Sequence, residues 1–118
     1  MDLAVPTISE TALDRTLAAI ADPTRRAILA RLAEGETRVT ELAAPFAMSL
    51  NAVSKHVRVL EQAGLVHRRV EGRVHNLSLD SRPLAEASAW IDGYRRFWEA
   101  RLDSLERFLR DNNEDGGP

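Results

Sequence analysis

The sequence contains no cysteine, which excludes disulfide bonds, thiolate metal sites and cysteine nucleophiles. No apolar run approaches the roughly 18 residues that a membrane-spanning helix needs, and the first ten residues lack the basic-then-apolar pattern of a secretion signal. Six glycines and five prolines in 118 residues are too few for a low-complexity or collagen-like chain. A single globular domain in the cytoplasm is therefore expected.

Charged and aromatic side chains are unevenly distributed along the chain. The formal net charge is −2, yet residues 49–79 contain five lysines and arginines against two glutamates, and they hold all three histidines. Five of the six aromatic residues lie between residues 90 and 108. A local basic patch on an acidic body is typical of a protein that approaches a polyanion with one face.

Capping residues predict three helices in the first part of the chain. Ser9 is a candidate N-cap of the first helix, and Asp22 followed by a proline begins the second. Gly35 stands where the second helix is expected to end. Thr40 is expected to cap a short third helix, which Pro45 limits because proline removes a backbone donor.

A longer amphipathic helix is predicted between Ser49, its candidate N-cap, and Gly64. Its inner face repeats at spacings of four and three and consists of Val53, Val57 and Leu60. Asparagine, serine, lysine and arginine side chains occupy the outer face. Such a helix fits either a DNA-reading element or an ordinary surface helix with a solvated polar face.

A β-hairpin and a last helix complete the domain. Residues 65–70 and 73–79 are rich in β-branched and apolar residues, and Glu71-Gly72 between them is typical of a two-residue turn. Apolar residues at three- and four-residue steps predict a helix over about residues 81–110. Residues 1–8 are expected to form a flexible N-terminal arm and residues 111–118 a disordered tail, which leaves 9–110 as one domain.

The order helix, helix, short helix, helix, strand, strand, helix predicts a mainly helical fold with a two-stranded β-hairpin, the winged helix-turn-helix. In this fold the recognition helix, here residues 49–64, enters the major groove of DNA, and the hairpin, or wing, follows the backbone or the minor groove. The candidate DNA-binding residues are Ser49, Asn51, Ala52, Ser54, Lys55, Arg58, Arg68, Arg69 and Arg73. The alternative is a winged-helix protein-interaction module whose basic face docks an acidic partner.

The apolar face of the last helix is too wide for one neighbour in a domain of this size. We therefore expect a homodimer formed through the first and last helices. The candidate interface residues are Leu13, Leu17, Trp90, Ile91, Tyr94, Phe97, Trp98, Leu102 and Leu105. A twofold dimer would place two recognition helices about 34 Å apart and would require a near-palindromic operator in double-stranded DNA.

The sequence contains no pattern typical of a catalytic site, a cofactor site or a metal site. It has neither a Gly-rich phosphate loop nor a Ser–His–Asp order, and the carboxylates of the last helix alternate with arginines as on a solvated face. His56 flanks the buried stripe of its helix and is interpreted as a packing residue. His67 and His75 have only Glu71 near them, which is too few ligands for a metal ion.

Three stretches of the chain carry a family resemblance: ADPTRRAILARLAEGE, TELAAPFAMSLNAVSKHVRVLEQAGLV and HRRVEGRVHNLSL. Together they resemble the winged-helix repressors of the ArsR type. The resemblance implies a homodimeric bacterial regulator that represses its own or a neighbouring operon, with Ser49–Arg58 as the recognition helix and Val66–Leu77 as the wing. Metal-sensing members carry a Cys-x-Cys-type motif in the short helix or histidine ligands on the last helix, and this chain has neither. The resemblance is therefore to the metal-independent subgroup, and it leaves a small-molecule inducer open.

Overall fold

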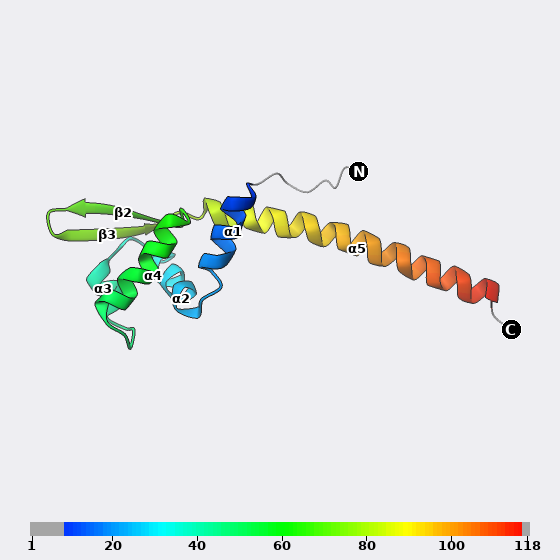
Figure 1. Ribbon diagram of the computed structural model, residues 1–118, viewed down its shortest axis with the longest axis horizontal. Coiled ribbons are helices and arrows are strands. Elements are labelled where there is room, and N and C mark those ends of the chain that lie inside the picture. The colour runs from blue at the N-terminus through cyan, green and yellow to red at the C-terminus, as the bar shows by residue number, and fades with distance from the viewer. Residues whose placement is uncertain (1–8, 117–118) are drawn as a thin grey trace. The chain divides into compact units, whose positions relative to one another are not determined.

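The structure is a computed structural model that describes residues 9–116, with side chains through Asn113 (Figure 1). In chain order the elements are α1 (Glu10–Ala19), α2 (Pro23–Leu32), β1 (Thr37–Arg38), α3 (Val39–Ala43), α4 (Leu50–Gln62), β2 (Val66–Glu71), β3 (Val74–Leu79) and α5 (Arg82–Gly116). The described residues fall into two units that divide between Ala87 and Ser88, within α5. The predicted arm at residues 1–8 lies outside the described residues, as do residues 117–118.

The first two helices begin at the predicted caps. The hydroxyl of Ser9 accepts a hydrogen bond from the N–H of Ala12 at 3.4 Å, and Oδ2 of Asp22 accepts one from the N–H of Arg25 at 3.0 Å. Pro23 occupies the first position of α2, where a missing N–H costs nothing. The backbone N–H of Arg25 stabilises the charged form of Asp22 and so lowers the pKa of that carboxyl.

The short helix α3 differs from its prediction at its start. It begins at Val39, follows Arg38 without a side-chain capping bond, and places Thr40 inside its first turn. The prediction that Thr40 is the cap was wrong because Thr37 and Arg38 are held in strand β1, so the chain passes from the sheet directly into the helix. The helix has five residues and ends before Pro45, as predicted.

The sheet contains three antiparallel strands in the order β1-β3-β2. The hairpin was predicted, but its turn is Gly72-Arg73, since Glu71 pairs with Val74. Gly72 has a φ of +61°, a conformation that glycine adopts without steric cost. The prediction had two strands. The third strand, β1, pairs Thr37 with Leu77 of β3. It is only two residues long, which is too short to show the alternation of apolar and polar residues that predicts a strand.

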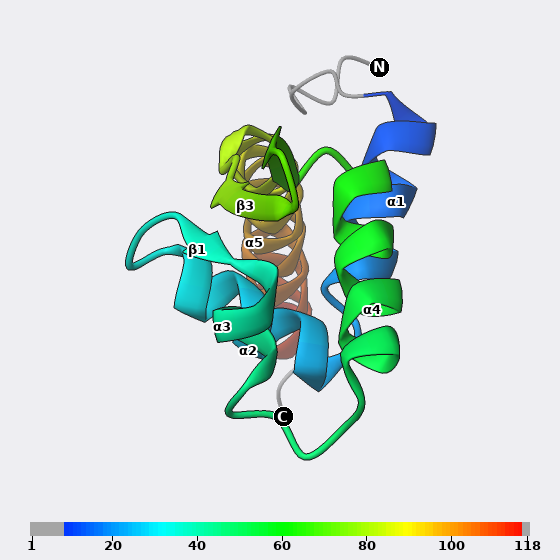
Figure 2. The ribbon, with the colours of Figure 1, turned by 90° about the vertical axis from the view of Figure 1, so that its left-hand side faces the viewer.

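Helix α4 lies against α1, α2, α3 and β2 in the N-terminal unit (Figure 2). The core of this unit consists of Ala19, Ile28, Leu29, Leu32, Leu42, Val53, Val57, Leu60, Leu65, Val66 and Leu77. These residues come from every helix from α1 to α4, from β2 and β3, and, at Leu65, from the turn before β2. The recognition helix is therefore fixed on its inner side by the whole unit.

Helix α5 continues further than predicted. The sequence placed its end at Arg110, whereas the structure continues the helix to Gly116, so residues 111–116 of the predicted disordered tail are helical. Extending an existing helix costs little, because each added residue gains one backbone hydrogen bond. None of the described helices is both long enough and apolar enough to cross a lipid bilayer.

Candidate nucleic-acid interface

Helix α4 has one apolar face and one polar face, as predicted. The inner face is fully buried and consists of Val53, Val57 and Leu60. On the outer side Asn51, Lys55 and Arg58 are exposed, and Ser54 is half-buried. Because packing fixes the inner face, the outer side chains project from fixed positions on the helix.

The first turn of α4 is fixed by its cap. The hydroxyl of Ser49 accepts a hydrogen bond from the N–H of Ala52 at 3.1 Å, and the Ser49 carbonyl accepts one from Val53 at 3.1 Å. The Ala52 N–H is therefore already used inside the helix. Ser49 and Ala52 stabilise the turn that carries the exposed Asn51.

Arg73 and Arg69 occupy different positions on the wing, which is the hairpin of β2 and β3. Arg73 lies in the tip turn, is exposed, and forms no ion pair with any residue in the described part of the chain. Arg69 pairs with Glu36, in the loop before β1, and with Glu71 on its own strand. These pairs are exposed to solvent and contribute little, so a phosphate can compete for Arg69.

Arg68 is bound inside the protein. Its Nε and Nη2 donate to the two carboxylate oxygens of Glu61 at 3.2 and 2.8 Å, and its Nη1 lies 3.0 Å from Nδ1 of His75. The hydrogen bond to Glu61 raises the pKa of Arg68 above its usual value. The local positive charge predicted Arg68 as a DNA-binding residue, and the structure shows that its guanidinium is already engaged by Glu61 and His75.

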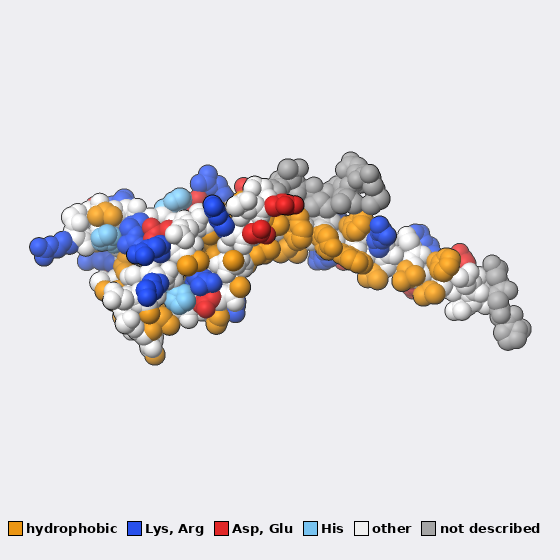
Figure 3. Space-filling model, in the orientation of Figure 1, with side chains coloured by type: hydrophobic (Ala, Val, Ile, Leu, Met, Phe, Trp, Pro, Cys, Tyr) orange, Lys and Arg blue, Asp and Glu red, His pale blue; other side chains and the backbone are white. Residues whose placement is uncertain are grey.

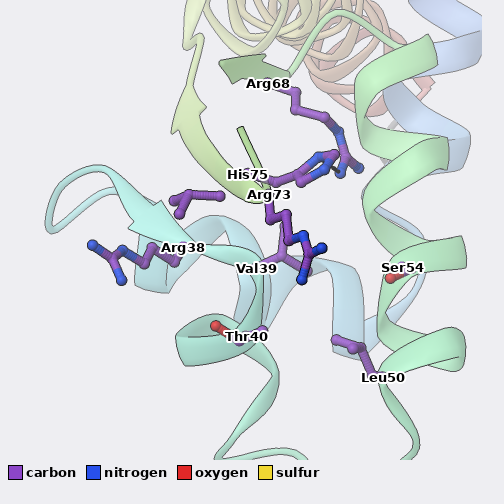
Figure 4. Close-up of a pocket in the computed structure, with 9 residues that line it drawn as sticks. Arg38, Val39, Thr40, Leu50, Ser54, Arg68, Arg73 and His75 are labelled. Atoms are coloured by element: carbon purple, nitrogen blue, oxygen red, sulfur yellow. Dashed lines mark hydrogen bonds between the residues drawn. The ribbon is translucent and has the colours of Figure 1, made fainter. Parts of the chain in front are cut away.

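A hollow of about 350 Å³ lies between the wing tip and the helix-turn-helix (Figure 4). Its walls include Arg38, Thr40, Leu50, Ser54, Arg73 and His75. In the figure the guanidinium of Arg73 points toward the space between α3 and α4, whereas that of Arg38 points away from it. Arg38 and Thr40 were not predicted as surface neighbours of Ser54, because both precede the basic stretch in the sequence. Their position at the start of the helix-turn-helix was the available signal.

A second hollow, of about 710 Å³, is lined by Asn51, Ser54, Arg58, Glu61, Gln62, Arg68 and His75. Arg68 and His75 line both hollows and therefore form part of the wall between them. The candidate DNA-binding residues Asn51, Ser54 and Arg58 are thus brought together on one surface.

Lysine and arginine side chains gather over the wing and α4, at the left of the space-filling view (Figure 3). Lys55, Arg58, Arg69 and Arg73 are the exposed members of the basic stretch identified in the sequence. A helix and a hairpin tip that both carry positive charge can contact phosphates on either side of a groove.

The histidines contact charged neighbours. Nδ1 of His56 lies 3.3 Å from Nη1 of Arg25 and 3.9 Å from Asp22, in agreement with a half-buried packing role. Nε2 of His67 lies 2.8 Å from Asp80. Within the described residues, no group of three histidine, aspartate or glutamate side chains is arranged to hold a metal ion.

Apolar side chains form a stripe along the part of α5 that follows Ser88. Ile91, Tyr94, Trp98, Leu102 and Leu105 are between 40% and 57% exposed. Trp90 and Phe97 are half-buried, and Trp90 stacks on Tyr94 with ring centroids 5.2 Å apart. Of the two predicted interface residues on α1, Leu17 is 36% exposed and Leu13 is already buried. The stripe on α5 is therefore the larger apolar surface.

Comparison with known proteins identifies the class. Residues 20–69 match the family model described as a helix-turn-helix domain. The chain is 39% identical over 102 residues to the HTH-type transcriptional regulator Rv2034 of Mycobacterium tuberculosis. The match covers 86% of this chain and 92% of that protein. It is 30% identical over 79 residues to the transcriptional repressor SdpR of Bacillus subtilis, covering 67% of this chain and 88% of that protein.

A solved structure described as the ArsR family transcriptional regulator RHA00566 matches the fold with a TM-score of 0.75. Its sequence is 36% identical, and the match covers 80% of this chain and 97% of that chain. The chain belongs to the ArsR family of winged helix-turn-helix transcriptional regulators. It is a DNA-binding regulator and not an enzyme, so the family favours double-stranded DNA over the acidic protein partner that the sequence left open.

Proposed function

We propose that the protein is a homodimeric cytoplasmic repressor that occupies a near-palindromic operator of its own or a neighbouring operon, without a metal effector. The observation that carries this proposal is the pairing of a fully buried inner face on α4 with an exposed outer face of base-reading and cationic side chains. The wing tip adds a further cation, Arg73, beside that face.

The contacts divide between affinity and sequence reading. Lys55, Arg69 and Arg73 contact phosphates and supply the salt-dependent part of the affinity. Asn51, Ser54 and Arg58 face the base edges, where an asparagine pairs with adenine and an arginine with guanine. Ser49 and Ala52 fix the start of the helix that carries them.

Dimerisation is supported by the spacing of the exposed stripe on α5. Ile91, Tyr94, Trp98, Leu102 and Leu105 follow one another at steps of three and four residues and so share one helix face. An exposed helix face of this kind favours pairing with its twofold copy, as in coiled coils. Trp90 and Phe97 border the stripe, and Leu17 on α1, which is 36% exposed, is a separate candidate for the interface.

A metal effector is disfavoured by the available ligands. The chain has no thiolate, and α5 has no histidine. Carboxylates alone suit hard ions rather than the softer metals that thiolate and imidazole sites bind. Repression itself is supported by the similarity to a protein named a transcriptional repressor.

Selection of genomic DNA fragments by the purified protein tests this function. We expect recovery of a few sites with an inverted repeat, one near the protein's own gene, and a mobility shift that a scrambled duplex of equal length does not show. A chelator added to the binding reaction should change the affinity for the operator by less than about twofold, since the proposed binding needs no metal ion. Sequence-blind retardation, or loss of binding on chelation, would contradict the proposal.

A further inference from the structure

Arg68 joins the wing to the recognition helix. It bridges both carboxylate oxygens of Glu61 on α4, and its Nη1 contacts Nδ1 of His75 on β3. A guanidinium only donates, so Nδ1 of His75 is the acceptor in this bond. One side chain of β2 therefore connects α4 with both strands of the wing. We call Arg68, Glu61 and His75 the α4–wing tie.

The tie lies where apolar packing between α4 and the wing has ended. At the base of the wing Val66 is 2% exposed, whereas Val70, nearer the tip, is 53% exposed. Hollows of about 350 and 710 Å³ flank the tie, and Arg68 and His75 line both. Polar contacts, and not core packing, therefore hold the outer part of the wing against α4.

The charge of Arg68 is balanced within the protein. Both oxygens of Glu61 are used, and the two side chains are 27% and 28% exposed. A phosphate that displaced Glu61 would leave a half-buried carboxylate without its partner, facing a polyanion. Arg73 at the tip has no such competitor among the described residues. The two arginines are therefore suited to different tasks.

We propose that Arg68 and Glu61 are positioning residues that set the spacing between the recognition helix and the wing, and so select the groove geometry of the DNA. The inference depends on the proposed function, because it assumes that both elements contact one duplex. A wing held at a fixed distance meets the neighbouring groove only where the width and bend of the duplex match. A wing that is no longer held can adjust to a duplex of any groove width. The protein then discriminates less between DNA sequences, while the attraction of its cations to phosphates remains.

The first test measures hydrogen exchange of wing amides in the full-length protein without DNA. Glu61→Gln keeps the side-chain shape, and Arg68→Lys keeps the charge but cannot bridge two oxygens. We expect faster exchange near the wing tip in each variant, unchanged exchange in α2, and no further increase in the double variant. Arg31→Lys is the matched control, because it alters an Arg–Glu pair, with Glu34 at 3.2 Å, away from the wing. If Glu61→Gln leaves the hydrogen exchange of the wing amides unchanged, Glu61 and Arg68 do not hold the wing, and the inference is overturned.

The second test measures affinity for a selected operator and for a scrambled duplex at several salt concentrations. Glu61→Gln and Arg68→Lys should lower the ratio of the two affinities about tenfold, with the slope of log affinity against log salt unchanged. An unchanged ratio in both variants overturns the proposal. The proposal is also overturned if Arg68→Gln lowers the affinity for both duplexes equally and flattens the slope of log affinity against log salt by about one. That result is the one expected from the loss of a phosphate contact.

The two tests separate this inference from the proposed function. If the wild-type protein prefers no duplex over a scrambled one, the proposed function fails, and the exchange measurement still decides whether the tie exists. If the wild type prefers an operator and wing exchange does not respond to the variants, the tie fails and the function stands.

Discussion

Three arginines on one hairpin show that the partner of a side chain decides its role. Arg68 is bound by Glu61, Arg69 shares its charge with two exposed glutamates, and Arg73 is exposed at the tip. The sequence predicts the charge and the approximate place of all three. It does not reveal their partners, because Glu36 lies 33 residues before Arg69 and reaches it only through the fold.

Asp80 precedes α5 and is surrounded by donors. Nη2 of the Arg82 side chain donates to it at 2.6 Å, the Arg82 backbone N–H at 3.0 Å, and Nε2 of His67 lies 2.8 Å away. These hydrogen bonds, chiefly those of the Arg82 side chain, hold the pKa of the Asp80 carboxyl well below its usual range. The charged form of Asp80 is thus favoured in the folded protein.

Asp80→Asn should make the stability of the protein less dependent on pH in the acidic range. A carboxyl whose pKa is lowered by folding stabilises the protein above its unfolded value of about 3.9, and this stabilisation is lost as the pH falls through the lower folded value. We expect the variant to have a lower Tm than the wild type at neutral pH, and the difference to shrink below about pH 4.

Thermal unfolding at several pH values measures this difference. Asp14→Asn, at an exposed position of α1, is the control and should leave the Tm nearly unchanged at every pH. A Tm difference for Asp80→Asn that stays constant down to the lowest pH would contradict the role assigned to the charge.

At the scale of elements, local signals placed most boundaries within one or two residues. Caps at Ser9, Asp22 and Ser49 make the hydrogen bonds that their residue types predict. Apart from the end of α5, the errors arise where tertiary pairing overrides local preference. Strand β1 takes over the residues before α3, and the register of β2 with β3 moves the turn to Gly72-Arg73. Such pairing joins residues that are far apart in the sequence, so a local sequence pattern cannot predict it.

The stripe on α5 predicts the oligomeric state. Leu102, 57% exposed, lies on the stripe, and a charge there would have to be desolvated in a dimer. We expect Leu102→Glu to convert the dimer to a monomer of 13.1 kDa, or to raise the dissociation constant at least about a hundredfold. Analytical ultracentrifugation over a range of protein concentrations measures this change.

Ala100→Glu provides the matched control for this substitution. Ala100 is exposed on the same helix and lies about 160° around it from the centre of the stripe, at 100° per residue. It should leave the dimer intact. A wild-type protein that stays monomeric at all concentrations, or a dimer that Leu102→Glu does not weaken, would contradict the proposed interface.

At the scale of the whole molecule, the sequence predicts the class of fold and the helix that we propose to face DNA. The order of elements, the buried stripe of α4 and the basic hairpin suffice for this, because each depends on local spacing. The candidate site was only partly predictable. Arg38 and Thr40 border it, and Arg68 lines it with its guanidinium bound to Glu61, through contacts between elements that only folding brings together.

The salt dependence of operator binding by the wild type and by Arg73→Ala tests the central claim most directly. Arg73 is exposed at the wing tip and points toward the hollow beside α4, so removing it should remove about one phosphate contact. We expect weaker binding to operator and scrambled duplexes alike, and a slope of log affinity against log salt that is flatter by about one. An unaltered affinity and slope would contradict binding of DNA by this surface.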